Sequence, residues 1–286
     1  MSFSLGLAIW GYKGWLGELF PAKAAARDFL KLYSRRFSIV EGNTTFYSIP
    51  DRDTVKRWAA ETPEGFLFFP KLPKTVTHEG NLLPHLPDAL RFLELMQGLG
   101  DRLGAMFLQL PPSYSPAYCK DLELFIQGWQ AATAVPLAVE VRHMGWFQPS
   151  CRDRLNELLS HYQVGRVLLD TRAIYRATDN PQQYSQNKKP DVPLDPIVTA
   201  PFSFVRYISH PILQNNLDYF AEWVDIVANW LVQGTQTYFF VHCPLEDHSP
   251  RNARRFQAML EQAGLEVPPL PWNLMAEETP SQLSLF

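Results

Sequence analysis

Polar and ionisable side chains stand at the ends of short apolar runs along this chain. They are Glu41, Asn43, Lys71, Gln109, Glu140, Arg142, Asp170, Arg206 and His242. Burying such groups without partners costs several kcal/mol each, so they must pair with one another or face water. If the runs that carry them end at one place in the fold, the sequence predicts a polar site there.

The acids and histidines in this set suggest proton-transfer or metal chemistry. Glu41, Glu140 and Asp170 could act as general acids or bases, or could bind a divalent metal. His78 and His242 could join them as bases or ligands. The sequence leaves open whether a metal is bound.

The cationic residues suggest an anionic substrate. Lys71, Arg142 and Arg206 could hold a phosphate or carboxylate group, and arginine suits bidentate contacts with both. The alternative is a purely structural network of ion pairs. In that network Glu140 would pair with Arg142 or Arg206, and Asp170 would pair with Lys71.

The stretch VEGNTTFYSIP (40–50) carries more hydrogen-bonding groups than a plain turn requires. We expect Asn43, Thr45 and Tyr47 to bind substrate, with Phe46 beside them in the wall of a cleft. Trp146 is either an aromatic wall of the same cleft or simple packing.

Eight strand-length apolar runs position these residues. They span 4–10, 37–43, 65–72, 103–110, 136–142, 165–171, 202–208 and 237–243. Most are continuously apolar, which is typical of parallel strands that are covered on both faces.

Helical periodicity occupies most of the intervening segments. The predicted helices span 22–36, 51–62, 87–100, 117–134, 151–163, 215–233 and 250–263, with Asp51 and Ser249 as candidate N-caps. The segment 172–201 lacks a clear helix and is expected to be a long loop over one mouth of the fold. Strands that alternate with helices in this way predict a single-domain TIM (β/α)8 barrel, whose sites lie at the C-terminal ends of the strands.

Composition narrows the class of protein. The chain has 286 residues, 46% of them hydrophobic, and a net charge of −3, which provides no global attraction for nucleic acid or an anionic membrane. Cys119, Cys151 and Cys243 lie too far apart in sequence for a zinc or redox motif. We see neither a signal peptide nor an apolar run of about 20 residues, so we expect a cytoplasmic protein with no membrane partner.

Six segments together resemble a known family. FSIVEGNTTFYSIP, FFPKLPKTVTHEG, LQLPPSY, AVEVRH, LLDTR and FVRYI, in this order, are similar to the YecE-like family, a domain of unknown function numbered seventy-two. The resemblance covers roughly residues 4–265 and lies nearest the YecE branch. It implies a TIM barrel but no established activity.

The family pattern also implies which positions belong to the site. Matched positions are Glu41, Asn43, Thr45, Tyr47, Lys71, His78, Gln109, Glu140, Arg142, Asp170 and Arg206. Many members carry Asn-Asn after strand eight and His-Gly after strand seven, whereas this chain has VHCPLEDHSPRNAR and RYISHP. Any role of His242 or His210 would therefore depend on the branch of the family.

The C-terminus has a different character. We expect residues 1–267 to form the barrel domain and 268–286 to form a Pro-rich, acidic tail. The final QLSLF is similar to the motif by which bacterial replication and repair proteins bind the sliding clamp. Its anchors would be Gln282, Leu283, Leu285 and Phe286.

Two hypotheses of different class follow. The first is an enzyme, a hydrolase, nuclease or isomerase, that acts on a phosphate- or sugar-containing substrate. Its catalytic residues would be Glu41, His78, Glu140 and Asp170. The substrate would be an anionic small molecule or a nucleic acid. The second hypothesis is a non-catalytic ligand-binding or adaptor protein that is recruited to the sliding clamp by its tail.

Overall fold

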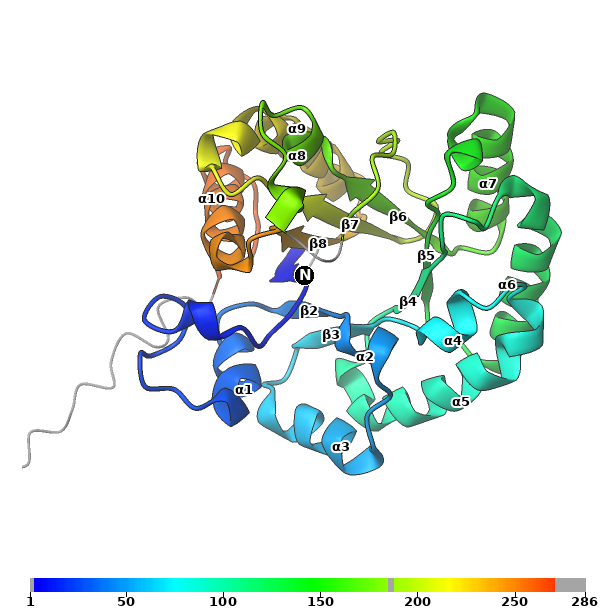
Figure 1. The fold of residues 1–286 in the computed structure, drawn as a ribbon, viewed down its shortest axis with the longest axis horizontal. Helices are drawn as coiled ribbons and strands as arrows, with labels where there is room; N and C mark the ends of the chain where they lie inside the picture. Colours follow the sequence, from blue (N-terminus) through cyan, green and yellow to red (C-terminus); the bar gives the residue numbers. More distant parts are fainter. Residues whose placement is uncertain (1–2, 185–187, 271–286) are drawn as a thin grey trace, which may run out of the picture.

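All eight apolar runs form strands of one parallel sheet. The computed structural model describes residues 3–184 and 188–270. The strands are β1 Phe3–Leu7, β2 Ile39–Gly42, β3 Leu67–Pro70, β4 Met106–Gln109, β5 Leu137–Glu140, β6 Gly165–Asp170, β7 Phe202–Ile208 and β8 Gln236–His242. They pair in the order β3-β2-β1-β8-β7-β6-β5-β4, which is that of a (β/α)8 barrel (Figure 1).

The barrel is nearly, but not fully, closed. β7 and β8 pair over seven residues, from Phe202↔Gln236 to Ile208↔His242. Between β3 and β4 the described residues form only two isolated bridges, Phe68↔Leu103 and Lys71↔Phe107. The predicted fold class is confirmed. The pairing of β3 with β4 is the least extensive between neighbouring strands of the barrel.

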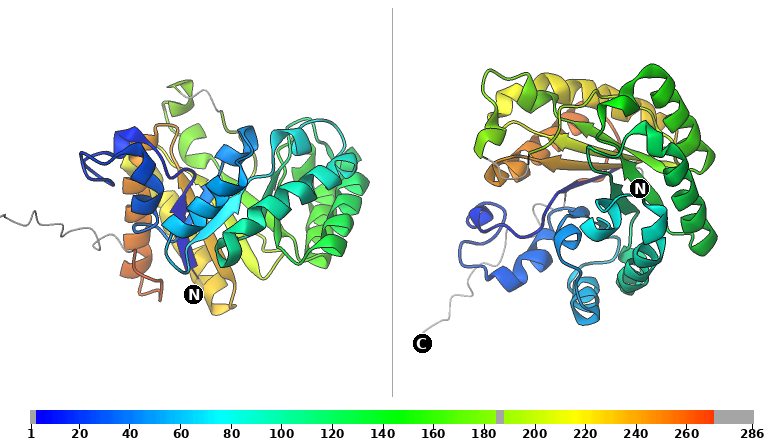
Figure 2. Two further views of the ribbon diagram at one scale, coloured as in Figure 1. Left: turned by 90° about the horizontal axis from the view of Figure 1, so that it is seen from below. Right: turned by 45° about the vertical axis from the view of Figure 1, so that its right-hand side comes forward.

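A ring of helices covers the outside of the sheet (Figure 1). These helices are α1 Phe29–Tyr33, α3 Arg52–Glu61, α5 Leu86–Met96, α6 Cys119–Ala132, α7 Pro149–His161, α9 Leu217–Val232 and α10 Ser249–Gln262. Short helices α2 Thr44–Tyr47, α4 Lys74–Thr77 and α8 Arg172–Tyr175 begin within a few residues of the C-terminal ends of β2, β3 and β6. Figure 2 shows the same arrangement from two further directions.

Helix boundaries differ from the predicted ones in two places. The predicted helix over 22–36 is reduced to a 3-10 turn, Ala26–Asp28, followed by the single-turn α1. Asp51 caps α3 as predicted, since its side chain accepts a hydrogen bond from the Thr54 amide at 2.7 Å. Ser249 is not an N-cap, because it lies inside α10 and its hydroxyl donates to Glu246.

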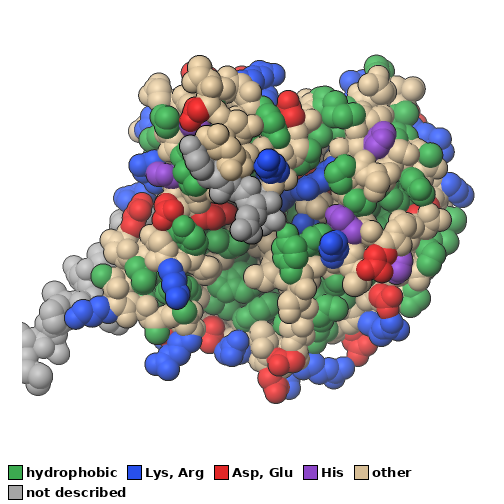
Figure 3. Space-filling model, in the orientation of Figure 1, with side chains coloured by type: hydrophobic (Ala, Val, Ile, Leu, Met, Phe, Trp, Pro, Cys, Tyr) green, Lys and Arg blue, Asp and Glu red, His purple; other side chains and the backbone are tan. Residues whose placement is uncertain are grey.

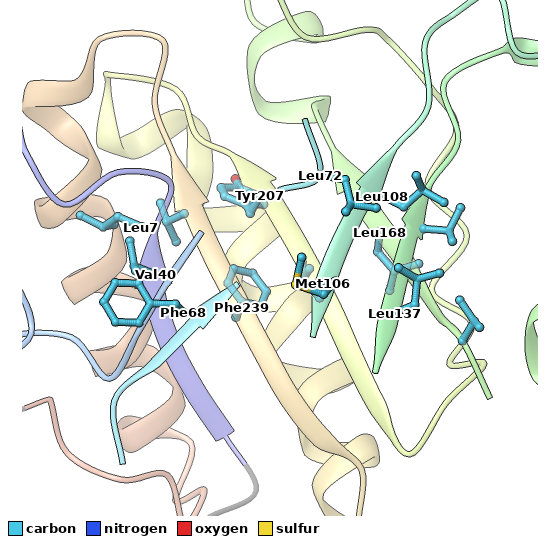
Figure 4. Close-up of a cluster of buried hydrophobic side chains, with 14 of the residues drawn as sticks. Leu7, Val40, Phe68, Leu72, Met106, Leu108, Leu137, Leu168, Tyr207 and Phe239 are labelled. Carbon is cyan, nitrogen blue, oxygen red and sulfur yellow. The ribbon is translucent and has the colours of Figure 1, made fainter. Parts of the chain in front are cut away.

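Alternating side chains give the barrel two apolar layers. Outward-facing residues such as Leu7, Val40, Phe68 and Met106 pack under the helices (Figure 4). Inward-facing Phe69, Phe107, Phe204 and Phe240 form a separate aromatic cluster inside the barrel. Their ring centroids lie 4.7–5.5 Å apart, so this layer fills the interior and forms a floor beneath the polar residues above it.

The long segment after β6 is more ordered than the sequence predicts. It contains α8 and a 3-10 helix, Pro181–Tyr184. Side-chain hydrogen bonds connect the two ends of this segment. The Tyr175 hydroxyl donates to the Lys189 carbonyl at 2.7 Å, and Gln182 Nε2 donates to the Tyr175 hydroxyl and to the Lys189 carbonyl. Within the described ranges, no helix is long and apolar enough to cross a membrane.

Candidate active site at the mouth of the barrel

A layer of buried charges lies directly above the aromatic floor. Because strand side chains alternate, the inward positions that follow Ile39, Ala138, Phe204 and Phe240 are Glu41, Glu140, Arg206 and His242. All four side chains are almost completely buried. Four strands therefore place predicted site residues next to one another inside the barrel, as the sequence predicts.

Arg206 is the centre of this layer. Its Nε and Nη2 donate to the two carboxylate oxygens of Glu41 at 2.7 and 2.8 Å. Its Nη1 donates to Glu140, whose other oxygen accepts from Arg142 Nε at 2.6 Å. His242 Nε2 lies 3.1 Å from Glu41. Glu140 therefore pairs with both Arg142 and Arg206, whereas the sequence suggested one or the other.

These contacts fix the protonation of the buried groups. Burial alone would favour neutral carboxyls, but Arg206 and His242 hold the pKa of Glu41 well below its usual value. In the same way, burial is outweighed by Arg142 and Arg206, which lower the pKa of Glu140 to about 2. Burial lowers the pKa of His242 to about 4 despite the adjacent Glu41. The layer thus holds two carboxylates, one guanidinium and a neutral imidazole at neutral pH.

A cavity of about 610 Å³ opens above this layer. Its lining comprises Ala8, Ile9, Asn43, Thr44, Phe46, Tyr47, Lys71, Lys74, His78, Gln109, Arg142, Gln182, Lys188, Lys189, Ile208, His242, Cys243, Pro244 and Glu246. In Figure 3, Lys and Arg side chains and a histidine gather around the hollowed middle of this face. The size is typical of a pocket for a small molecule.

Lys71 and Arg142 are joined at the cavity wall through Gln109. The Gln109 Oε1 atom accepts hydrogen bonds from Lys71 Nζ at 2.7 Å and from Arg142 Nη2 at 2.6 Å. Lys71 Nζ also lies 3.9 Å from the ring centroid of Phe46. Three predicted site residues from β3, β4 and the end of β5 therefore act as one unit.

Burial and neighbouring positive charges depress two further pKa values. Burial, followed by Arg206 and Arg142, lowers the pKa of Lys71 well below its usual value. Burial, Lys71 and Arg142 lower the pKa of His78 to about 4. His78 Nδ1 lies 2.7 Å from the Thr77 hydroxyl, so its orientation is fixed. The mouth holds a neutral imidazole next to an amine that loses its proton easily.

Several cavity residues were not among the predicted site residues. Lys74 is the first residue of α4, after β3, and Lys188 and Lys189 come from the long segment after β6. Burial lowers the pKa of Lys189 to about 8. The NKKP run (187–190) was the available signal, but a lysine pair in a loop is usually only solvated.

Glu246 is a further cavity residue that the sequence did not single out. It lies after β8, and its carboxylate accepts a hydrogen bond from the Ser249 hydroxyl at 2.8 Å. Burial raises the pKa of Glu246 to about 7. It is therefore the cavity carboxyl that can exchange a proton near neutral pH.

Besides Glu41, Glu140 and Arg206 in the buried layer beneath it, three predicted site residues are absent from the cavity lining. Asp170 points away from the barrel interior, where it accepts hydrogen bonds from Arg172 and from Trp223 Nε1 at 2.8 Å. The predicted pairing of Asp170 with Lys71 is wrong, because alternate residues of β6 point to opposite faces. Trp146 is buried, and its Nε1 donates to the Tyr114 carbonyl.

Thr45 is the third of these residues. It is buried, and its hydroxyl lies 2.8 Å from the Gly42 carbonyl oxygen and 2.7 Å from that of Lys71. It therefore joins the ends of β2 and β3. Asn43 and Tyr47, in contrast, line the cavity as expected, and Asn43 Nδ2 donates to the Ala8 carbonyl at 3.0 Å.

The donor set does not fit a divalent metal. Among the described residues, no group of three or more His, Cys, Asp or Glu could hold a metal ion. The oxygens of Glu41 and Glu140 already accept hydrogen bonds from guanidinium groups, so a cation between them would have to displace Arg206.

Comparison with known proteins shows the family to which this chain belongs. Residues 4–275 match the family described as "Protein of unknown function DUF72". The chain is 31% identical over 290 residues to UPF0759 protein YecE of Escherichia coli (strain K12), covering 99% of both chains. The chain belongs to the DUF72 family. The family resemblance expected from the sequence is therefore confirmed.

Further similar proteins have lower sequence identity to this chain. UPF0759 protein YunF of Bacillus subtilis (strain 168) is 29% identical over 193 residues, which cover 61% of this chain and 66% of YunF. The crystal structure of a DUF72 family protein (TM1631) from Thermotoga maritima has a TM-score of 0.67 at 20% identity, covering 91% of this chain and all of that one. That of EF0366 from Enterococcus faecalis has a TM-score of 0.66 at 18% identity, covering 91% of this chain and 97% of that chain. At such identities the two structures show the fold alone.

Proposed function

We propose that the chain is an enzyme that binds a small anionic molecule, carrying a phosphate or carboxylate group, at the mouth of the barrel. The observation that carries this proposal is the excess of positive charge around the cavity. Lys71, Lys74, Arg142, Lys188 and Lys189 border it. The two carboxylates directly beneath are paired with Arg206 and Arg142, which leaves the lysines as the excess charge.

Arg142 is the residue best placed to hold the anion. Its Nε and Nη2 are fixed by Glu140 and Gln109, so the guanidinium is oriented before a ligand arrives. Such preorganisation reduces the entropy lost on binding. Lys74 and Lys189 border the same cavity and add charge attraction.

The acid and base roles differ from those that the sequence suggests. Glu41 and Glu140 are held as carboxylates with all their oxygens engaged, so neither is a good proton donor near neutral pH. His78, Lys71 and Glu246 border the cavity with pKa values shifted towards neutral or below. These three groups suit proton transfer in an isomerisation or a hydrolysis of the bound anion.

Calorimetric titration with inorganic phosphate tests the proposal, with sodium chloride at matched ionic strength as the salt control. Arg142→Gln should weaken phosphate binding by about 10- to 100-fold, because a hydrogen bond to a charged group contributes roughly 1.5–3 kcal/mol. The matched control is Arg52→Gln on α3, whose guanidinium forms an exposed ion pair with Glu94. A screen of sugar phosphates and small carboxylates for turnover would then define the substrate.

Equal phosphate affinity in the wild type and Arg142→Gln would contradict the proposal. So would the absence of any heat or thermal stabilisation with phosphate and with small carboxylates. Loss of binding in Arg52→Gln as well would show that the effect is non-specific electrostatics rather than a site.

The C-terminal motif supports a second proposal, that the chain is recruited to the bacterial sliding clamp. Gln282, Leu283, Leu285 and Phe286 lie outside the described residues, so the support comes from sequence alone. Clamp pull-down by the full chain should be lost in Phe286→Ala and kept in Ser284→Ala. Clamp binding by both variants would contradict the proposed recruitment. If recruitment is observed without any anion binding, the adaptor hypothesis replaces the enzyme.

A further inference from the structure

Lys71 is a buried amine at the edge of a cavity, and its surroundings are unusual for a lysine. Its side chain is only 6% exposed, yet it borders the cavity. Nζ donates to Gln109 and lies over the face of Phe46. The carboxylates of the layer below bond to Arg206 and Arg142, and in the described ranges none forms an ion pair with Lys71.

These surroundings favour the neutral amine. Burial removes water from the ammonium group, and the positive charges of Arg206 and Arg142 oppose a third charge beside them. Phe46 and the Gln109 oxygen stabilise the ammonium, and the nearby carboxylates of Glu140 and Glu41 act against the shift, but burial and the two guanidinium groups outweigh them and lower the pKa of Lys71. A desolvated lysine next to other cations is the arrangement that makes an amine a nucleophile near neutral pH.

We propose that Lys71 forms a Schiff base with an aldehyde or ketone group of the anionic substrate. This inference rests on the proposed function, since the anion brings the carbonyl to the amine. The Nζ lone pair attacks the carbonyl carbon, a C–N bond forms, and the carbonyl π electrons move to oxygen. The oxygen then leaves as water with both amine hydrogens, and the C=N bond remains.

His78 is placed to assist the proton transfers. It borders the same cavity, and its ring centroid lies 5.0 Å from that of Phe46, the ring beneath Lys71 Nζ. As a neutral imidazole it can take a proton from the attacking amine and return it to the departing oxygen. No oxidant, reductant or cofactor is needed for this step.

The spacing of Lys71 and Arg142 defines the substrate class. Both donate to the one Gln109 oxygen, so their donor atoms lie within roughly 5 Å of each other. An anionic group on Arg142 would therefore lie only a few bonds from the carbonyl carbon on Lys71. Small 2-oxo acids and phosphorylated hydroxyaldehydes or hydroxyketones meet this requirement.

Reductive trapping tests the inference. The intact protein is incubated with glyoxylate or with dihydroxyacetone phosphate, and borohydride is added to reduce any imine to a stable secondary amine. Propanal is the uncharged control carbonyl. Mass spectrometry of the protein and of its peptides then locates the adduct. We expect one adduct on Lys71 with at least one anionic probe, and little with propanal.

Three variants make the test specific. Lys71→Arg and Lys71→Met should lose the adduct, and circular dichroism with thermal unfolding shows that both variants fold. Lys120→Arg removes an exposed lysine on α6, outside the cavity, and should keep the adduct. Inorganic phosphate should compete with trapping in the wild type.

The outcomes separate this inference from the proposed function. Phosphate binding that depends on Arg142, without an adduct at Lys71 from either probe, would overturn the inference and leave the anion site intact. The inference would also be overturned if adducts form only on exposed lysines. It would be overturned too if Lys71→Arg forms the same adduct as the wild type. Failure of all anion binding would overturn both.

Discussion

Arg206 donates two hydrogen bonds to the Glu41 carboxylate in the buried interior of the barrel, from Nε at 2.7 Å and from Nη2 at 2.8 Å. The two residues lie on β7 and β2, which are not neighbours in the sheet. The pair therefore spans the barrel directly above its aromatic floor. Its geometry makes Arg206 a structural support for the site above, rather than a free anion-binding group.

Arg206→Met should destabilise the protein strongly. The substitution keeps much of the side-chain volume but leaves Glu41 and Glu140 buried with fewer partners. We expect the free energy of unfolding to fall by about 3–5 kcal/mol, which is typical when one partner of a buried ion pair is removed. Urea denaturation followed by circular dichroism measures the change.

A matched exposed pair provides the control for Arg206. Arg52 and Glu94 form an ion pair with side chains 79% and 70% exposed. Arg52→Met should change the free energy of unfolding by less than about 1 kcal/mol. Similar losses in both variants would show that the buried layer is not the stabilising unit that its geometry suggests.

The contribution of His242 to stability should fall as the pH is lowered from about 6.5 to about 4. The pKa of His242 drops from 6.5 in the unfolded chain to about 4 in the fold, mainly through burial. In that window the unfolded chain binds the proton that the fold excludes, so acid favours unfolding. The contribution of His242 is on the order of 3 kcal/mol and is fully present only above about pH 6.5.

His242→Gln should flatten this part of the pH profile, because glutamine keeps a donor for Glu41 but does not titrate. His161→Gln on the exposed end of α7 should leave the profile unchanged. Thermal unfolding midpoints across the pH range give the comparison. Identical pH profiles for the wild type and His242→Gln between pH 6.5 and 4 would refute the assignment.

Asp170→Asn should affect stability and not ligand binding. Asp170 bonds to Arg172 and Trp223 on the outer side of the sheet. We expect a loss of about 2–4 kcal/mol in the free energy of unfolding, with phosphate affinity unchanged. Reduced affinity in a variant of normal stability would restore the site role that the sequence suggests.

Gln182→Ala should weaken anion binding through Lys189. Gln182 accepts from the Lys189 amide and donates to Tyr175, so it holds the lysine at the cavity edge. We expect phosphate affinity to fall about fivefold, equivalent to about 1 kcal/mol, with little change at Lys71 in the trapping assay. Gln183→Ala, at the exposed neighbour, should retain full affinity, and equal losses would contradict a positioning role.

Local pattern was enough to predict the barrel and part of its site. Continuous apolar runs with helices between them gave all eight strands. Parallel strands then brought Glu41, Lys71, Gln109, Glu140, Arg142 and Arg206 to one end. The wrong prediction concerned the face of the sheet to which a side chain points, because a shift of one residue along a strand reverses that face. Asp170 ends its strand just as Glu140 does, but it points to the other face.

The sequence by itself determined the order of the strands and the kinds of groups at their ends, because hydrophobic periodicity is a local property of the chain. Only the tertiary structure decided which charges cancel. Arg206 takes both carboxylates and leaves Lys71 without an ion-pair partner among the described residues, because distances across a closed barrel depend on how far each strand is offset from its neighbours. That division of charge is the basis of the proposed anion site at the mouth.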